Sequence, residues 1–286
     1  VRNLGDLVNE WVTINEPNVY LHGGYVNGIW PPGVKGNKLY YKAAKNIICS
    51  HIKSYKKIHE TRLNLNKNDT MVGVAFHLRI FDPKGGFLDK IVSGLSDRLF
   101  HEIFISGMTE GKLISPVGSG YPYGKGKYFD FFGINYYTRD LVSFTFNGLV
   151  KTEYKNDSQK NDLGWEIYPE GIYRLCKKYF ERFKMPIYIT ENGIADRNDD
   201  KRIEFIYNHL YYIKKLINEG VDIRKYYHWT FIDNFEWIEG YEAKFGLISF
   251  DINTQKRTVK NSGYFYKEII ENKGVIDAML KKYNLD

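Results

Sequence analysis

Cysteine, proline and long apolar runs are all scarce in this chain of 286 residues, which holds two cysteines and eight prolines. Two cysteines are too few for the dense disulfide framework that stabilises small secreted folds. The chain has no apolar stretch as long as the roughly 18 residues that a transmembrane helix needs, so no membrane span is expected. The hydrophobic content of 43% instead predicts a globular protein with a sizeable core.

The two cysteines, Cys49 and Cys176, each fall within an amphipathic helical pattern. We interpret them as buried free thiols, which are typical of a reducing, cytoplasmic compartment. A disulfide between them is the alternative.

Signatures for nucleic acids, nucleotides and metal ions are missing as well. The net charge is +7, but the lysines are scattered over predicted helix faces without an arginine-rich block, which favours a solvated surface over nucleic-acid binding. No glycine-rich phosphate loop follows a predicted strand, which argues against a nucleotide-binding open sheet. No spacing of histidine, cysteine and aspartate fits a metal site, so we expect neither a metal nor a cofactor.

Short apolar runs alternate with longer helical patterns along the chain. Strands are predicted at residues 10–15, 71–78, 130–137, 186–190 and 224–232, and helices at 39–59, 87–108, 169–183, 202–218 and 262–270. A polar stretch at 139–165 is predicted to be a loop or a hairpin. The repeated strand-then-helix order implies an α/β fold with parallel strands and right-handed crossovers.

Two closures of such a sheet are possible, a doubly wound open sheet or a (β/α)8 TIM barrel. Polar residues concentrate where the predicted strands end, and a site built from many strand ends favours the barrel. Five predicted strands cannot close an eight-stranded barrel. The sequence therefore predicts that residues 1–286 form a single, incomplete (β/α)8-barrel domain.

Two glutamates occupy unusual positions at the ends of predicted strands. Glu16 ends the run WVTINE and precedes a proline, and Glu191 ends the run PIYITE and precedes Asn-Gly. A carboxylate there destabilises the fold unless it is paired or used, and a structural salt bridge or a helix start is the alternative for each. Glycoside hydrolysis needs two facing carboxyl groups, about 5–5.5 Å apart for retention of configuration and farther apart for inversion.

Four segments of the chain occur together in a characteristic order. They are WVTINEP at 11–17, FGINYYT at 132–138, TENG at 190–193 and HWTFIDNFEW at 228–237. With this combination the chain resembles glycoside hydrolase family 1, which includes β-glucosidases and β-galactosidases. The resemblance implies retaining hydrolysis of terminal β-linked sugars through a covalent glycosyl-enzyme, with a β-glucoside as the first expected substrate.

The resemblance also implies roles for individual residues, with Glu191 as the nucleophile and Glu16 as the acid/base. The residues that it implies for substrate binding are Asn15, Asn135, Tyr137, Trp229, Glu236, Trp237 and Phe245. Asn15 would bind the sugar 2-hydroxyl, Tyr137 would keep the nucleophile ionised, and Glu236 would bind the 4- and 6-hydroxyls. The mechanism requires a raised pKa for the acid and a charged nucleophile.

Two further expectations concern the choice of substrate and the position of His77. The Glu236 carboxylate would repel a sugar phosphate, so we expect non-phosphorylated glycosides as substrates. His77 ends a predicted strand and is interpreted as a hydrogen-bonded core histidine, with a position on the leaving-group side of the sugar as the alternative.

The resemblance begins only at the fourth strand of the family. A glutamine and a histidine that the family contributes from earlier strands have no counterpart here, so we expect strands 4 to 8 alone. Open strand edges invite pairing with other chains, and we expect this chain by itself to be poorly soluble, self-associating or inactive. The alternatives are a catalytically silent half-barrel that binds sugar or a partner, and another retaining barrel hydrolase with two strand-end glutamates.

Overall fold

A mostly parallel sheet forms the centre of the computed structural model, which describes residues 1–285. The parallel strands lie in the order β1 (Glu10–Asn15), β2 (Met71–Pro83), β3 (Phe131–Thr145), β5 (Ile187–Asn192) and β6 (Ile223–His228). The short strand β4 (Leu149–Glu153) pairs antiparallel with β3. The order in space follows the order in sequence and never reverses, as in a (β/α)8 barrel and unlike a doubly wound sheet.

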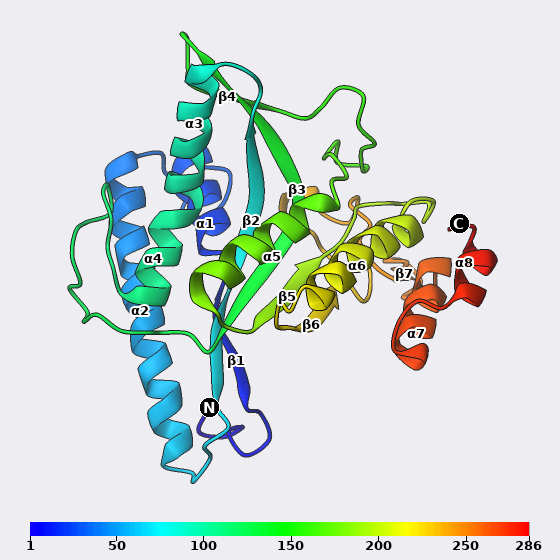
Figure 1. Ribbon diagram of the computed structural model, residues 1–286, viewed down its shortest axis with the longest axis horizontal. Coiled ribbons are helices and arrows are strands. Elements are labelled where there is room, and N and C mark those ends of the chain that lie inside the picture. Colours follow the sequence, from blue (N-terminus) through cyan, green and yellow to red (C-terminus); the bar gives the residue numbers. More distant parts are fainter. Residues whose placement is uncertain (286) are drawn as a thin grey trace.

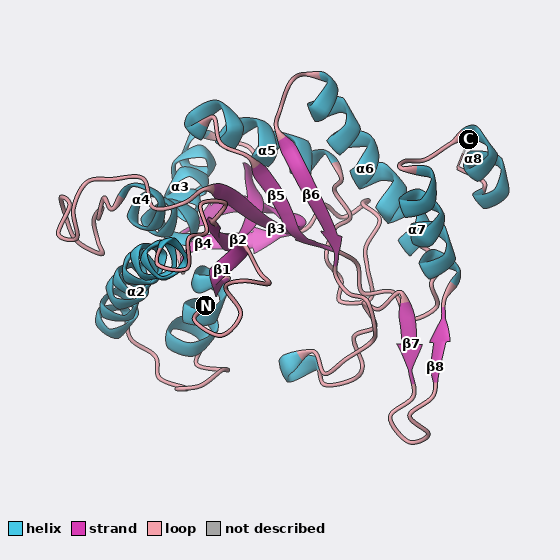
Figure 2. Cartoon of the chain, turned by 90° about the horizontal axis from the view of Figure 1, so that it is seen from below, coloured by secondary structure: helices cyan, strands magenta, loops and turns pink. Residues whose placement is uncertain are grey.

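Helices join the strands and cover one face of the sheet (Figure 2). They are α1 (Pro17–Leu21), α2 (Asn37–Leu63), α3 (Phe87–Asp97), α4 (Ile103–Glu110), α5 (Glu170–Phe183), α6 (Arg202–Asn218), α7 (Asn261–Asn272) and α8 (Asp277–Tyr283). Shorter elements are the π-helical turns η1 (His22–Asn27) and η2 (Arg98–Glu102), the 3-10 turn η3 (Trp237–Glu239) and the hairpin of β7 (Ile248–Phe250) and β8 (Arg257–Val259). Figure 1 shows α7 and α8 at the far end from α2.

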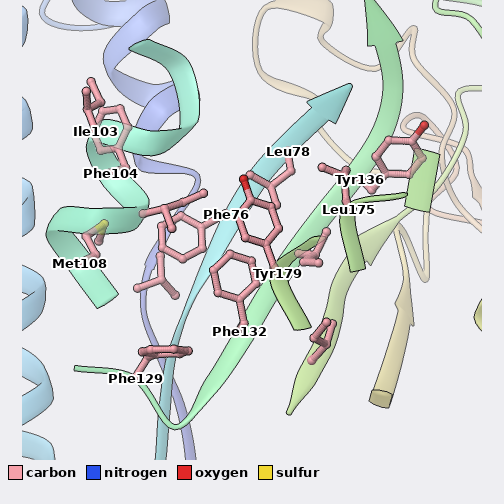
Figure 3. Packing of buried hydrophobic residues seen from close by; sticks show 14 of the residues in the cluster. Phe76, Leu78, Ile103, Phe104, Met108, Phe129, Phe132, Tyr136, Leu175 and Tyr179 are labelled. Atoms are coloured by element: carbon pink, nitrogen blue, oxygen red, sulfur yellow. The ribbon is translucent and has the colours of Figure 1, made fainter. Parts of the chain in front are cut away.

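The main core lies between the sheet and its covering helices. Phe76 on β2 stacks on Phe132 on β3 at a ring-centroid distance of 5.1 Å, and Phe132 stacks on Tyr179 on α5 at 4.7 Å. Figure 3 shows these rings packed together with Leu175 and Met108. The sequence of strand β2 is almost entirely apolar up to Leu78, because side chains on both faces of the strand are buried there.

The predicted elements are confirmed, with differences at their ends. Strands β2 and β3 run past residues 78 and 137 because they continue to pair up to Pro83 and Val142 and lead into a hairpin with β4. Strand β6 stops at His228, since the backbone then turns and the amide of Thr230 bonds to the carbonyl of Phe245. The helix expected at 87–108 is divided by η2.

Both cysteines are free thiols, as expected, with Cys176 buried and Cys49 half-buried. Among residues 1–285, no helix combines the length and the apolar character required to cross a bilayer.

Candidate active site

The register of the parallel strands brings polar residues together at one end of the sheet. His77 on β2 lies beside Asn135 on β3, and Asn135 lies beside Glu191 on β5. Asn15 lies beside Ala75 on β2, so the last residue of β1 reaches the same end. This end is formed by the carboxyl termini of the strands, where barrel enzymes carry their active sites.

Glu16 follows β1 in the left-handed backbone conformation, with φ 45° and ψ 56°. This conformation is unfavourable for a residue with a Cβ atom and persists only where surrounding contacts impose it. The Glu16 amide donates to the Ala75 carbonyl at 2.8 Å, which holds the turn in place. Its side-chain Oε1 lies 3.0 Å from His77 Nδ1 and accepts from Asn135 Nδ2 at 3.0 Å.

Glu191 lies across the same network of hydrogen bonds. The Tyr137 hydroxyl donates to Glu191 Oε2 at 2.7 Å. Asn135 connects Glu16 to the strand that carries Glu191, because its Oδ1 accepts from Thr190 Oγ1 at 2.5 Å. Its Nδ2 also donates to Asn15 Oδ1 at 3.0 Å. The side chain of Asn135 is fully buried, so these contacts fix the relative positions of the carboxylates.

The pKa values of the two glutamates move in opposite directions. Burial and the neighbouring Glu16 carboxylate raise the pKa of Glu191 to about 8, against hydrogen bonds from Tyr137 and Asn15. Burial also acts to raise the pKa of Glu16, but His77 and the Asn135 hydrogen bond outweigh it and lower that pKa. This order of the two pKa values is the reverse of the order that the expected roles of Glu16 and Glu191 require.

The cause of this reversal is the basic side of the Glu16 environment. His77 contacts Glu16 directly, and Arg79 on the same strand adds a second favourable charge. Glu191 has neutral donors instead, and its partner Tyr137 stays protonated because burial and the Glu191 charge raise the pKa of its hydroxyl. Two interacting carboxyl groups lose their protons as a pair, so the last proton belongs to both groups.

A cavity of about 900 Å³ contains this pair. Of the nine residues expected from the sequence, eight line it, namely Asn15, Glu16, Tyr137, Glu191, Trp229, Glu236, Trp237 and Phe245. The ninth, Asn135, lies behind them and bonds to Glu16. The structure thus brings the whole set together from the ends of β1, β3 and β5 and from the segment that follows β6.

The side chains after β6 form one wall of the cavity. Trp229 Nε1 donates to Glu236 Oε2 at 3.4 Å, which orients the carboxylate. Burial is the main cause of a raised pKa for Glu236. Trp237 is 66% exposed, whereas Phe245 is 3% exposed and its ring lies edge-on to that of Tyr137. This wall offers aromatic faces and one acceptor group, which suits a sugar ring with hydroxyls at its edge.

Two cavity residues lie outside the nine that were expected for catalysis and substrate binding, although a position near the leaving group was the alternative for His77. His77 is buried, as the core interpretation requires, but its partner is Glu16 and it lines the cavity. Its place at the end of a strand level with Asn135 was the available signal. The centroid of the Trp165 ring lies 6.0 Å from that of Tyr137 and 6.3 Å from that of Phe245. Trp165 belongs to a segment predicted as a loop or hairpin, and no sequence pattern indicated its place in the cavity.

Known proteins share this sequence pattern. The profile described as glycosyl hydrolase family 1 matches residues 1–113 and 125–275. The chain belongs to glycosyl hydrolase family 1. Beta-glucosidase A of Thermotoga maritima is 33% identical over 302 residues, covering 96% of this chain and 66% of that protein. The beta-galactosidase of Saccharolobus solfataricus is 32% identical, covering 96% of this chain and 57% of that protein.

Solved structures of family 1 glycosidases share the fold. The beta-glycosidase of Pyrococcus horikoshii aligns with a TM-score of 0.89 at 34% identity, covering all of this chain and 66% of that chain. The beta-glucosidase of Thermotoga maritima in complex with castanospermine aligns with a TM-score of 0.84 at 30% identity. These alignments confirm the incomplete (β/α)8 barrel. The chain spans at most about two thirds of the length of these curated relatives.

The described residues, 1–285, contain no group of three or more histidine, cysteine, aspartate or glutamate side chains arranged to hold a metal ion.

Proposed function

We propose that this chain carries the acid/base and the nucleophile of a retaining β-glycosidase that acts first on β-glucosides. The observation that supports this most directly is the meeting of Glu16 and Glu191 in one cavity, with Tyr137 bonded to Glu191 and Asn135 bonded to Glu16. Retaining hydrolysis needs two carboxyl groups that act on the same glycosidic bond.

The reaction proceeds in two steps. The Glu191 carboxylate attacks the anomeric carbon while Glu16 gives its proton to the leaving oxygen, so the glycosidic bond breaks as the glycosyl-enzyme forms. Water then attacks the same carbon, Glu16 accepts a proton from it, and Glu191 leaves as a carboxylate. Asn15, which accepts a hydrogen bond from Asn135, binds the sugar 2-hydroxyl. Glu236 binds the 4- and 6-hydroxyls.

This chemistry uses the carboxyl pair when it holds a single proton. The reactive arrangement has that proton on Glu16 and the charge on Glu191, whereas the local pKa order favours the opposite placement. The hydrogen bond from Tyr137 favours the charged form of Glu191 and so works toward the reactive arrangement.

The substrate range follows from the wall after β6. The Glu236 carboxylate repels a sugar phosphate, so this cavity suits non-phosphorylated glycosides.

We also propose that residues 1–286 form one partial catalytic domain that further polypeptide completes. Strand β1 pairs only with β2, and β6 pairs only with β5, within residues 1–285. The relatives extend beyond the matched region. A segment with the remaining strands would cover these edges. Without it, self-association through them is the expected behaviour.

The test uses this chain together with the polypeptide that supplies the remaining strands. It is covalent labelling with 2-deoxy-2-fluoro-β-D-glucosyl fluoride, a sugar whose glycosyl-enzyme breaks down slowly. We expect one label per chain, located by peptide mass spectrometry on Glu191. Turnover of 4-nitrophenyl β-D-glucoside should disappear in Glu191→Gln and persist in Glu239→Gln, a matched change of an exposed glutamate that lines the same cavity.

A label on another residue, or equal turnover in the two variants, would overturn the assignment. The second candidate function is a catalytically silent sugar-binding half-barrel, which the unpaired edges of β1 and β6 favour. Saturable binding of glucosides without any labelling would support that function instead.

A further inference from the structure

The imidazole of His77 has a different neighbour at each of its two ring nitrogens. Its Nδ1 lies 3.0 Å from Glu16 Oε1, and its Nε2 lies 3.5 Å from Arg79 Nη2. A guanidinium group has N–H donors only and stays charged at any pH at which proteins are folded. A ring nitrogen that faces it therefore favours a lone pair over a hydrogen. The neutral imidazole then holds its hydrogen on Nδ1 and donates it to Glu16.

The guanidinium of Arg79 is held in place by neighbours from two other elements. Its Nη1 donates to Oδ2 of the buried Asp140 on β3 at 2.7 Å. Its backbone amide donates to His101 Nε2 on η2 at 3.3 Å, and His101 Nδ1 lies 2.9 Å from Asp97 Oδ1. Since Nε2 of His101 accepts, its hydrogen lies on Nδ1 and His101 is neutral. Arg79 thus faces His77 as a fixed cation.

The contacts of His77 also restrict its ring. Its backbone carbonyl accepts from Asn18 Nδ2 at 2.7 Å. The ring stacks on that of Tyr137 with centroids 6.0 Å apart, and it lies edge-on to Phe100 at 6.1 Å. The titratable groups around the imidazole are Glu16 after β1, Arg79 on β2, Tyr137 on β3 and His101 on η2.

One oxygen of Glu16 accepts from two donors. Besides His77 Nδ1, the Nδ2 of Asn135 donates to Glu16 Oε1 at 3.0 Å. The amide orientation of Asn135 is set by Thr190 Oγ1, which donates to its Oδ1. A protonated carboxyl oxygen is itself a donor, so a hydrogen on Oε1 would be directed against two N–H groups. The proton of the Glu16 acid therefore belongs on Oε2.

We propose that Arg79 is a positioning residue, which keeps His77 neutral with its hydrogen on Nδ1 so that the transferable proton stays on Glu16 Oε2. The part that concerns this proton rests on the proposed function, because it needs Glu16 as the acid. The competing arrangement moves the proton from Glu16 Oε2 to His77 Nε2 and leaves an imidazolium beside a carboxylate. Arg79 opposes that arrangement, because the imidazolium would be a like charge in contact with it.

Nitrogen-15 NMR of the histidine rings tests the first part without turnover. The sample is the chain, labelled on histidine, together with the polypeptide that supplies the remaining strands, and His77→Asn identifies the His77 signals. A ring nitrogen with a hydrogen and one with a lone pair resonate far apart. We expect hydrogen on Nδ1 alone from about pH 5 to 8, the range in which an ordinary histidine changes charge.

Two variants of Arg79 locate the cause of this pattern. In Arg79→Met, both nitrogens of His77 should carry hydrogen at the acid end of the range, because the opposing cation is gone. Arg79→Lys keeps a cation that has donors only and should restore the wild-type pattern.

The leaving-group dependence of kcat/KM tests the second part. An alkoxide needs a proton in order to leave, whereas 2,4-dinitrophenolate does not. Arg79→Met should lower kcat/KM for methyl β-D-glucoside at least about tenfold, the effect of one pKa unit in the position of a proton. It should leave kcat/KM for 2,4-dinitrophenyl β-D-glucoside unchanged.

Arg139→Met is the matched control. Arg139 on β3 also forms an ion pair with a buried carboxylate, that of Glu166 at 2.8 Å, but it lies outside the cavity lining. This variant should leave the His77 signals unchanged and should not separate the two substrates. A purely structural role of Arg79 would give the same result in Arg79→Met.

A hydrogen on Nε2 of His77 in the wild type, an unchanged pattern in Arg79→Met, or equal losses for the two substrates would overturn the inference. The wild-type spectrum decides even if Arg79→Met does not fold. Hydrogen on Nδ1 alone without fluorosugar labelling contradicts the proposed function, whereas labelling of Glu191 with hydrogen on Nε2 contradicts only the role of Arg79.

Discussion

The carboxylates at the two ends of the sheet differ in their partners and in the direction of their pKa shifts. At the carboxyl end, Glu16, Glu191 and Glu236 line one cavity. Burial raises the pKa of Glu191 and Glu236, and it acts in the same direction on Glu16, whose pKa is nevertheless lowered by His77. At the amino end, Glu10 on β1 forms an ion pair with Lys225 on β6 and accepts from the Tyr188 hydroxyl at 2.8 Å. These hydrogen bonds outweigh burial and lower the pKa of Glu10.

A second carboxylate at the amino end also connects neighbouring elements. Asp130 accepts from the Val72 amide at 2.8 Å, from the Tyr55 hydroxyl at 3.0 Å, and contacts His59 Nε2 at 2.8 Å. The amino end thus uses its charges to join strands and helices. The carboxyl end keeps carboxylates close to one another, which lowers stability but suits acid/base chemistry. Barrel enzymes typically carry the active site at the carboxyl ends of the strands and stabilising contacts at the amino ends.

The largest expected contrast comes from the same substitution at both ends. Glu16→Gln should lower turnover of alkyl β-glucosides by about 10²–10⁴-fold, because the leaving oxygen loses its proton donor. Glu10→Gln should leave turnover unchanged and lower the free energy of unfolding by up to about 1 kcal/mol, since it weakens a half-exposed ion pair. Steady-state kinetics and urea unfolding check both. Comparable kinetic losses in the two variants would remove the distinction between the ends.

A smaller contrast concerns two neighbouring tyrosines on β3. Tyr137→Phe removes the hydrogen bond to Glu191 and should slow the reaction by roughly 10- to 100-fold, the value of a bond to a charged group. The Tyr136 hydroxyl donates to the Tyr168 carbonyl at 2.6 Å on the helix side of the sheet. Tyr136→Phe should therefore cost about 1 kcal/mol of stability and leave the kinetics unchanged. A slower reaction in Tyr136→Phe would show that the two faces are not independent.

Stability should change in opposite directions at the two ends. The pKa of Glu191 is about 8 in the folded chain against an ordinary value of 4.5, so the folded state holds the extra proton between these values. Stability then falls as the pH rises through this range, because the folded chain must give up a proton that the unfolded chain has already lost. Glu191→Gln avoids this loss.

The variant Glu191→Gln should accordingly unfold at a higher temperature than the wild type at pH 9 and at a similar temperature at pH 4. Asp130→Asn should unfold at a lower temperature at pH 9, since it weakens the network with Tyr55 and His59. Calorimetry at the two pH values measures both. A destabilised Glu191→Gln at pH 9 would mean that the Glu191 carboxylate is stabilised in the folded chain.

The smallest expected effect is a shift of the pH profile. Turnover should fall above about pH 8, where the carboxyl pair loses its last proton. His77 lowers the pKa of Glu16, so His77→Asn should move this alkaline limb to higher pH. His209→Asn is the control, because His209 is buried on α6 against Phe205 and does not line the cavity. An unmoved limb in His77→Asn would show that His77 does not tune the pair.

Much of the fold was accessible from the sequence. The helix at Arg202–Asn218 was predicted with its exact bounds, because its apolar residues are spaced three and four apart. Strand ends were less accurate, since β2 and β3 continue only because they pair with each other and with the β4 hairpin. No local pattern encodes a partner strand.

The sequence by itself determined which residues stand at the carboxyl ends of strands, and its resemblance to glycoside hydrolase family 1 implied that Glu16 and Glu191 belong to one site. Periodicity and chain breakers are local signals, and parallel strands bring their ends to the same edge. Only the tertiary structure decided that His77 contacts Glu16, that the pKa of Glu191 exceeds that of Glu16, and that Phe100 lines the same cavity. These properties depend on distances between residues far apart in the chain, because charge and burial act through space.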